Sequence, residues 1–232
     1  MSPWQKRYEE MGGDIQMIKL DKCIRVNTKK ISAEKLKKRL EAKNVELERV
    51  PFVKNGFYVK SSRFNLVSSP EYLSGLFYIQ AASAQVPVEV LKPEGLALDA
   101  FAAPGGKTTQ LAEYCDVIAV DSKRERFEAL QNNLERLGVA NCIAYLMDFR
   151  AVNKTFKYIL LDAPCSGNYM LEKHWIRRNT LKRVNERAEK QKAYIAHAIS
   201  LLEKDGVLVY STCSLEPEED ELVARELTAK ER

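Results

Sequence analysis

The second half of the chain alternates short apolar runs with amphipathic helical patterns. The runs occupy residues 96–101, 117–120, 143–147, 158–161 and 207–210. Strands separated by helices imply βαβ units, so this region predicts a Rossmann-like, doubly wound α/β fold with a mostly parallel sheet. In such sheets ligands bind at the carboxyl ends of the strands. The residues directly after each run are therefore the first candidates for a functional site.

A smaller mixed α/β unit precedes this sheet. The pattern predicts a strand at residues 24–26, an amphipathic helix opened by Ser32, and short strands around residues 57–59. We assign this unit to residues 1–68.

Residues 69–90 predict one connecting helix. Pro70 lies near its first turn, where proline is tolerated, and Pro87 lies close to its end. The Rossmann-like domain is then assigned to residues 69–232.

Composition narrows the class of protein. Among the 232 residues, 45% are hydrophobic and 30% are charged, and no apolar run approaches the roughly 18 residues that span a bilayer. The first ten residues lack the apolar segment of a signal peptide, so we expect a cytoplasmic protein without a membrane partner. The cysteines form no C-x-x-C pair, and His174 and His197 complete no ligand cluster. We therefore expect reduced thiols and no metal site.

Positive charge gathers in two parts of the chain. The formal net charge is +5, and residues 1–63 hold roughly 16 Lys and Arg against about 8 Asp and Glu. A polyanion can dock on such a unit, although a solvated helix at residues 33–43 would give the same pattern. Residues 173–192 are also basic and contain Trp175, which suits phosphate contacts and stacking on an unpaired base. An ordinary exposed helix face is the alternative there.

A glycine-containing turn follows the first apolar run and leads into a helix from about Thr108. Gly105 and Gly106 let the backbone approach a ligand, and the helix N-terminus offers free N–H groups to a carboxylate or phosphate. The spacing matches neither a Walker phosphate loop nor G-x-G-x-x-G. A tight strand-to-helix turn without a ligand would need the same glycines.

Acidic residues end the next two runs. Asp121 follows the second run, where a Rossmann-like unit places the acceptor of the ribose hydroxyls, and Asp148 follows the third, where it can accept from an adenine amino group. A single aspartate after a strand is more often a helix cap or turn former. Three aligned sites together favour an adenosyl ligand.

Two cysteines follow the last two runs. Cys165 and Cys213 lie in polar loops that we expect at the ends of neighbouring strands, on the ligand side of the sheet. A buried structural thiol is the commoner role of any single cysteine.

The loop motifs together resemble the Nop/Sun family of RNA cytosine-5 methyltransferases. They read Ala103-Pro104-Gly105-Gly106-Lys107-Thr108, Asp162-Ala163-Pro164-Cys165-Ser166-Gly167 and Tyr210-Ser211-Thr212-Cys213-Ser214-Leu215-Glu216-Pro217-Glu218-Glu219. Upstream, Arg25-Val26-Asn27-Thr28, Ser69-Pro70-Glu71-Tyr72 and Ile79-Gln80 also resemble that family, in its order. Residues 162–168 are most similar to the archaeal members that modify tRNA.

This resemblance implies covalent catalysis at C5 of a cytosine. Cytosine C5 is a poor nucleophile, so a thiolate adds to C6 and produces an enamine that takes the methyl group. In the family the cysteine of the Thr-Cys motif is the nucleophile, which implies Cys213, and Cys165 then assists release of the product. A swapped assignment stays open, because DNA cytosine methyltransferases use a Pro-Cys cysteine. Asp162 would bind the N3/N4 edge of the base, and Lys107 would orient Asp162 or the base; a plain helix-start lysine is the alternative.

The resemblance also implies S-adenosyl-L-methionine as the methyl donor. Ala103, Pro104, Gly105 and Gly106, with Lys107 and Asp162 beside them, would hold its methionine part. Asp121 would bind the ribose, Asp148 the adenine, and Arg126 would assist at the ribose end. RNA is the implied partner, with tRNA favoured over ribosomal RNA, while DNA or a noncatalytic RNA-binding role are the alternatives.

The sequence departs from the family pattern in three places. Phe101 replaces a smaller residue, and Asn168-Tyr169 replaces the usual continuation of the Pro-Cys motif. The chain stops at Arg232, where family members usually add further strands, so we expect a truncated or minimal form.

Overall fold

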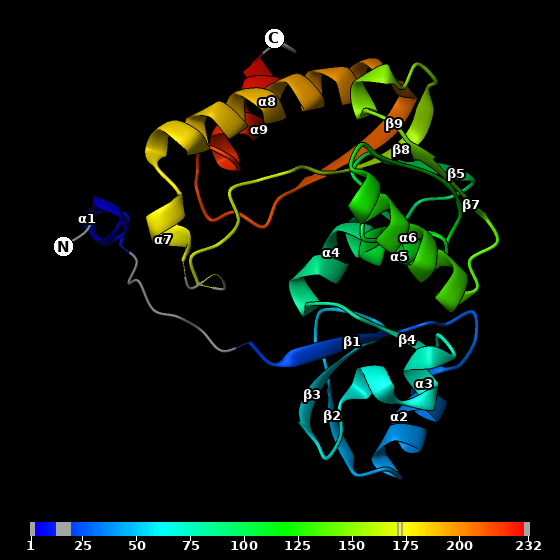
Figure 1. The fold of residues 1–232 in the computed structure, drawn as a ribbon. Helices are drawn as coiled ribbons and strands as arrows, with labels where there is room; N and C mark the ends of the chain where they lie inside the picture. Colours follow the sequence, from blue (N-terminus) through cyan, green and yellow to red (C-terminus); the bar gives the residue numbers. More distant parts are fainter. Residues whose placement is uncertain (1–2, 13–19, 171, 173, 230–232) are drawn as a thin grey trace. The chain divides into compact units, whose positions relative to one another are not determined.

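The computed structural model describes residues 3–12, 20–170, 172 and 174–229 (Figure 1). The chain divides into two compact units, and each is described by itself. The sheet unit comprises residues 21–162 and 197–210. The cysteine unit comprises the described residues of the segments 1–20, 163–196 and 211–232.

The sheet unit begins with a four-stranded antiparallel sheet in the order β2-β3-β1-β4. Its strands are β1 (Lys22–Val26), β2 (Val45–Arg49), β3 (Gly56–Ser62) and β4 (Phe77–Ile79). Helix α2 (Ala33–Glu41) packs against it through Leu36 and Leu40, both fully buried (Figure 1). The Ser32 side chain caps this helix by accepting the Lys35 N–H at 3.3 Å, as predicted.

The predicted connecting helix at residues 69–90 is wrong. A short helix α3 (Pro70–Leu73) is followed by β4 and then by α4 (Ala82–Leu91). Gly75 causes the break: its φ is +68°, and a Cβ there would collide with the Arg136 carbonyl. Residues 77–79 then pair with β1, a contact between distant residues that local periodicity does not reveal.

Strand β2 is absent from the sequence prediction for a related reason. Val45 and Leu47 face the core of the small sheet, whereas Glu46 and Glu48 are exposed. This alternation is short and highly charged, and it is stabilised as a strand by its pairing with β3 and by the burial of Val45 and Leu47.

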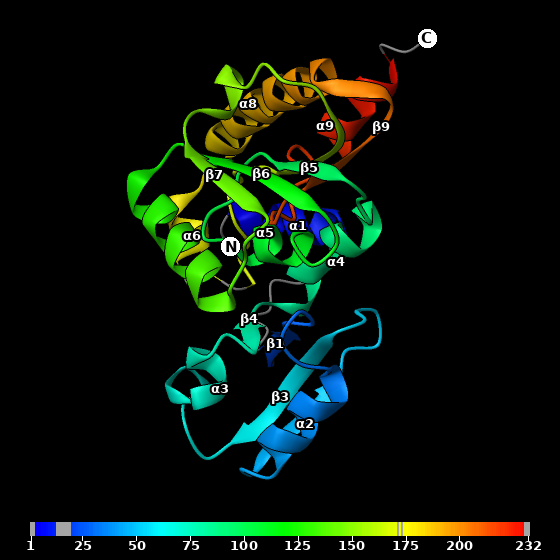
Figure 2. The same cartoon turned by 90° about the vertical axis from the view of Figure 1, so that its right-hand side faces the viewer.

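The second sheet has the order β7-β6-β5-β8-β9, and each predicted apolar run overlaps one of its strands. They are β5 (Leu96–Asp99), β6 (Asp116–Asp121), β7 (Cys142–Leu146), β8 (Phe156–Asp162) and β9 (Leu202–Ser211). The pairs β5–β6, β6–β7 and β5–β8 are parallel, which confirms the Rossmann-like prediction. Helices α4, α5 (Gly106–Leu111) and α6 (Arg124–Leu137) lie on one face (Figure 2), where their apolar side chains form one core with the strands.

The other described elements are short 3₁₀ turns and the helices of the cysteine unit. They are η1 (Leu66–Ser68), η2 (Phe149–Ala151), α1 (Pro3–Glu10), α7 (Trp175–Arg178), α8 (Leu181–Ser200) and α9 (Glu221–Ala229). A hydrophobic cluster within the cysteine unit consists of four aromatic residues, Trp4, Tyr8, Tyr169 and Trp175, together with Val184. In the part of the chain that the structure describes, no helix is both long and apolar enough to cross a membrane.

Candidate active site

The predicted glycine turn connects β5 to α5. Gly105 caps the helix with φ +105°, a left-handed conformation that a residue with a side chain adopts only at a cost. A Cβ at this position would also approach Leu130 Cδ1 to 3.0 Å. The backbone therefore needs glycine here, whether or not a ligand is bound.

A cavity of about 230 Å³ opens beside this turn, within the sheet unit. Its polar groups are Asp99, Lys107, Asp162 and Gln80, and its other lining residues include Ala103, Pro104 and Gly106. Sites for drug-sized ligands measure roughly 300–1,000 Å³. The cavity therefore has room for only part of a ligand of that size.

Lys107 and Asp162 form an ion pair in this cavity. Lys107 Nζ donates to Asp162 Oδ2 at 2.7 Å, and the two side chains are 16% and 33% exposed. Lys107 lies in the first turn of α5, which follows β5, and Asp162 ends β8, so the two neighbouring parallel strands β5 and β8 bring the two side chains together. The Lys107 ammonium group therefore holds the Asp162 carboxylate, while part of the Asp162 side chain stays exposed to solvent.

Asp99 is a residue of this cavity that the sequence analysis missed. It is 1% exposed, Thr108 Oγ1 donates to its Oδ2 at 2.7 Å, and its Oδ1 has no hydrogen-bond partner among the described residues. Burial raises the pKa of this carboxyl to about 7. The sequence could have indicated Asp99, because it is a carboxylate inside an otherwise apolar run. It was overlooked because the predicted strand continued through Phe101, whereas β5 ends at Asp99.

The stability of the fold should depend on pH through Asp99. Its pKa in the folded protein, about 7, lies above the ordinary 3.8, so the folded state binds the additional proton between these values. The free energy of unfolding should therefore fall as pH rises through this window, by at most about 1.4 kcal/mol per pH unit. Asp99→Asn should lack this fall. Urea denaturation at about pH 5 and pH 8 measures it, and equal pH dependence in both proteins would contradict the prediction.

Asp121 joins the end of β6 to the glycine turn. Its Oδ2 accepts the Ala103 N–H at 3.2 Å, its Oδ1 accepts the Lys123 N–H at 3.0 Å, and the side chain is nearly buried. Arg126 donates to the Ala103 carbonyl and lies 3.8 Å from the Asp121 carboxylate. Each carboxylate oxygen can accept more than one hydrogen bond, so Asp121 keeps acceptor capacity for a ligand.

Asp148 is partly exposed and is bound to a neighbouring residue, Arg150. Arg150 donates to it from the side chain at 2.6 Å and from the backbone at 2.9 Å, which caps η2. These bonds from Arg150 lower the pKa of Asp148 to about 2. Asp148 does not line the cavity beside the glycine turn.

The cysteine unit brings Cys165 and Cys213 together. Their sulfur atoms are 2.9 Å apart; Cys213 is exposed and Cys165 is partly buried. The hydrogen bond with Cys213 lowers the pKa of the Cys165 thiol, against desolvation that raises it. The other cysteines differ, because burial raises the pKa of Cys23 and Cys115 to about 11 and that of Cys142 to about 12. Cys165 and Cys213 are therefore the candidate reactive thiols among the described residues.

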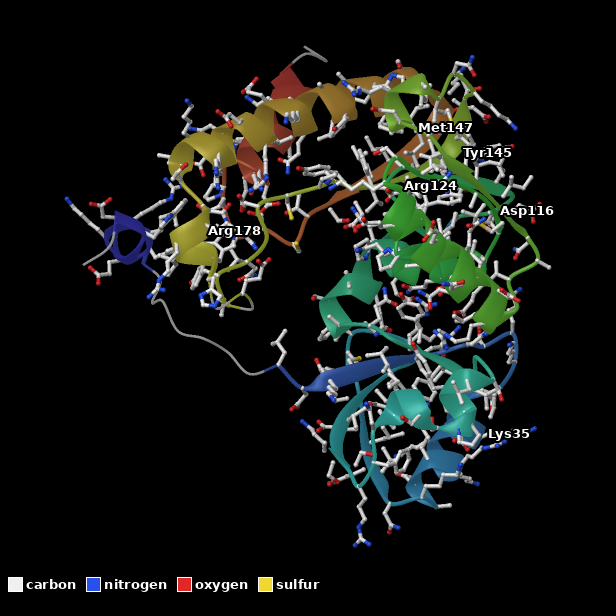
Figure 3. The ribbon with its side chains drawn as sticks, in the orientation of Figure 1. Lys35, Asp116, Arg124, Tyr145, Met147 and Arg178 are labelled. Atoms are coloured by element: carbon white, nitrogen blue, oxygen red, sulfur yellow. The ribbon has the colours of Figure 1, made fainter. Side chains whose placement is uncertain are left out.

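The expectation that Trp175, in the basic segment at residues 173–192, stacks on an unpaired base is wrong. Trp175 is 1% exposed, and its indole N–H donates to the Ser166 carbonyl at 2.9 Å, so it packs in a core and cannot stack on a base. Lys173 lies outside the described residues. Arg178, labelled in Figure 3, pairs with Glu172, and Lys182 is largely exposed.

The N-terminal positive charge is partly neutralised within the sheet unit. Arg39 and Lys43 bind the fully buried Glu71 at 2.6 and 2.5 Å, whereas Lys35 projects from α2 into solvent (Figure 3). Glu71 belongs to the Ser69-Pro70-Glu71-Tyr72 motif, so the role of this motif here includes tying α3 to α2. Among the described residues, no group of three or more His, Cys, Asp or Glu suits a metal ion.

Arg25, the first residue of the Arg25-Val26-Asn27-Thr28 motif, has a role that the sequence did not indicate. From β1 it donates to Gln80 Oε1 at 2.5 Å, to Thr109 Oγ1 at 2.7 Å and to the Gly106 carbonyl. Its side chain is 2% exposed and lies 3.3 Å from Glu113. This arginine links the small sheet directly to the glycine turn.

Known structures resemble this fold. A methyltransferase homolog protein from Pyrococcus horikoshii matches 91% of the chain, and 70% of its own, with a TM-score of 0.83 and 38% identity. NSun6 from the same organism, solved with SFG, an analogue of S-adenosylmethionine, matches 97% of the chain and 86% of its own, with a TM-score of 0.86 and 25% identity. The sheet, the glycine turn and these matches define an S-adenosylmethionine-dependent methyltransferase fold.

Sequence comparisons narrow this class. The model described as 16S rRNA methyltransferase RsmB/F matches residues 88–232, and that of the N-terminal domain of 16S rRNA methyltransferase RsmF matches residues 8–82. The tRNA (cytosine(49)-C(5))-methyltransferase of Pyrococcus abyssi is 41% identical over 89% of the chain, which spans 70% of that protein. Ribosomal RNA small subunit methyltransferase F of Vibrio campbellii is 39% identical over 90% of the chain. The chain belongs to the RsmB/F family, the Nop/Sun family of RNA cytosine-C5 methyltransferases, and spans about half the length of most curated relatives it matches.

Proposed function

We propose that this chain transfers a methyl group from S-adenosylmethionine to C5 of a cytosine in RNA, with Cys213 as the covalent nucleophile. The observation that carries the proposal is the pair of thiols, Cys165 and Cys213, with their sulfur atoms 2.9 Å apart. A noncatalytic RNA-binding protein would have no use for two adjacent thiols that share a proton, while the family to which the chain belongs consists of enzymes.

The two thiols have complementary tasks in this proposal. Cys213 Sγ, as a thiolate, bonds to C6 of the cytosine and makes C5 nucleophilic. S-adenosylmethionine, when bound, supplies the methyl group that C5 takes. Cys165, which holds the shared proton while Cys213 attacks, releases that proton to solvent and, as a thiolate, then removes the proton from C5. The electron pair of that C–H bond restores the C5–C6 double bond and expels the Cys213 thiolate. Exposure of Cys213 suits attack on a base that has left its stack.

Asp162 and Lys107 would hold the base during this chemistry. Asp162 contacts the N3/N4 edge of the cytosine, and the ion pair with Lys107 keeps its carboxylate in one orientation. Only Ala163 and Pro164 separate Asp162 from Cys165 in the chain, so substrate contact and proton removal come from one loop.

The residues of the glycine turn fit S-adenosylmethionine. The cavity beside Ala103 to Gly106 is sized for the methionine end, and Asp121 at the end of β6 retains capacity to accept from the ribose hydroxyls. Arg126 would support that end through its contact with the Ala103 carbonyl. For Asp148 we propose the adenine contact with the Arg150 pair intact, because the carboxylate can accept additional bonds.

Asp121→Asn should weaken cofactor binding about 10- to 100-fold, the equivalent of a hydrogen bond to a charged acceptor. Isothermal calorimetry with S-adenosylmethionine measures the loss. Asp116→Asn is the matched control: Asp116 begins the same strand and is exposed (Figure 3). Equal affinities in the two variants would refute a ribose contact by Asp121.

We favour tRNA as the substrate. The chain covers 70% of the Pyrococcus abyssi relative, which is named as a tRNA methyltransferase, but only 47% of the Vibrio campbellii ribosomal RNA methyltransferase. A tRNA substrate would also locate the reaction in the cytoplasm. The ribosomal RNA relatives support the second candidate. In either case we propose that the basic N-terminal unit, residues 1–68, binds the RNA ahead of the catalytic domain at residues 69–232.

The test is to incubate the protein with isotope-labelled S-adenosylmethionine and purified tRNA, ribosomal RNA or DNA of the same source. Nucleoside mass spectrometry then identifies the product. Labelled 5-methylcytidine from tRNA supports the proposal, label in ribosomal RNA alone selects the second candidate, and no labelled cytidine in any RNA overturns both.

A further inference from the structure

A buried carboxylate lies between the two cysteine loops of the cysteine unit. Glu219 is fully buried, and its oxygens accept the Ser166 N–H at 2.9 and 3.1 Å and the Ser214 hydroxyl at 2.7 Å. Gln191 Nε2 donates to it at 3.1 Å. Hydrogen bonds to an ionised acceptor are shorter and stronger than neutral ones, so this carboxylate is firmly held.

Both serines directly follow the reactive cysteines in the chain. Ser166 comes after Cys165 and Ser214 after Cys213, and the two hydroxyl oxygens are 3.2 Å apart. Glu219 therefore binds one residue of each loop at the same time.

Gln191 extends this arrangement to the other side of Cys165. Its Nε2 donates to the Pro164 carbonyl at 3.0 Å as well as to Glu219. Ser166, after Cys165, therefore bonds to the Glu219 carboxylate directly, and Pro164, before Cys165, is linked to it through Gln191. A shift of Glu219 would move the backbone on either side of that thiol.

We propose that Glu219 is a positioning residue that holds Cys165 and Cys213 at the separation where their thiols share a proton. This inference rests on the proposed function, since it assigns a purpose to that separation. Glu219 itself does not touch the substrate; it acts through the two serines.

The charge and the position of Glu219 have opposite effects on the thiols. Its negative charge raises the pKa of Cys165, whereas the contact with Cys213 that it maintains lowers that pKa more strongly. If Glu219 acted only through its charge, Glu219→Gln would therefore lower the pKa of Cys165. If it acts by positioning, the thiol contact loosens and the pKa rises.

The experiment is alkylation of the intact chain with iodoacetamide as a function of pH, with mass spectrometry to quantify modification at Cys165 and Cys213 separately. Only the thiolate reacts, so the midpoint of each profile follows the thiol pKa. For Glu219→Gln we expect the Cys165 midpoint to move up by about one pH unit, a tenfold lower rate near neutral pH. Ser214→Ala removes one bond to Glu219 but keeps the buried charge, and we expect a smaller shift in the same direction.

Glu221→Gln is the control, because Glu221 is an exposed carboxylate at the start of α9, two positions further along. It should leave the profile unchanged. A lowered or unchanged Cys165 midpoint in a folded Glu219→Gln protein would overturn the inference, and if that variant does not fold, an unchanged midpoint in Ser214→Ala would do so. Neither result affects the proposed function, which fails instead if the chain methylates RNA without Cys213.

Discussion

Replacing Cys213 by alanine should reduce RNA methylation by at least about 10⁴-fold, the size of effect seen when a covalent nucleophile is removed. Apart from Cys165, no other described thiol can take its place, since burial raises the pKa of Cys23 and Cys115 to about 11 and that of Cys142 to about 12. Cofactor affinity should stay near that of the wild type. Label transfer to tRNA and calorimetry with S-adenosylmethionine measure the two quantities.

The control for this variant is Cys142→Ala, which removes a partly buried thiol from β7. It should retain methylation within a few-fold. Activity of Cys213→Ala within tenfold of the wild type would refute the role of Cys213 and, with it, the covalent mechanism.

Cys165→Ala should accumulate a covalent complex between the protein and its RNA. The Cys213 thiolate can still add to C6, but the proton at C5 is no longer removed, so expulsion of the thiolate is slow. We expect a band that survives denaturing electrophoresis and disappears after RNase treatment. Turnover should fall by about 10²- to 10⁴-fold, the usual contribution of a general base.

The double variant Cys165→Ala/Cys213→Ala is the control and should give no complex. A stable complex with Cys213→Ala, and none with Cys165→Ala, would reverse the two roles. That reversed assignment is the one that DNA cytosine methyltransferases suggest, so the pair of experiments decides between the two.

The strands of the parallel sheet were predictable because each is a buried apolar run between amphipathic helices. The small sheet was predicted less well. Strand β4 depends on Gly75, which allows the backbone to pass close to Arg136, and on pairing with β1 about fifty residues earlier. Neither feature leaves a periodic pattern in the sequence, so residues 69–90 read as one helix.

For the candidate site, the sequence indicated the loops better than the role of each side chain within them. Trp175 is an aromatic residue of the kind that stacks on bases, but it is buried, and the partly exposed Asp148 is paired with Arg150. Asp99 did not stand out, and Glu219 was part of a motif but received no role, because an aspartate in a strand and a glutamate in an acidic segment are both common.

The sequence by itself determined where the strands of the second sheet lie along the chain, the glycine turn and the chemical identity of the candidate reacting groups, since these depend on local pattern and on residue type. The tertiary structure alone decided which groups are neighbours and what their surroundings do to them: that Cys165 contacts Cys213, that Lys107 pairs with Asp162, and that Asp99 is desolvated. The physical reason is that hydrogen bonds, ion pairs and burial depend on distance in space. Residues that are far apart in the chain come close together in space only when the sheets and helices have packed.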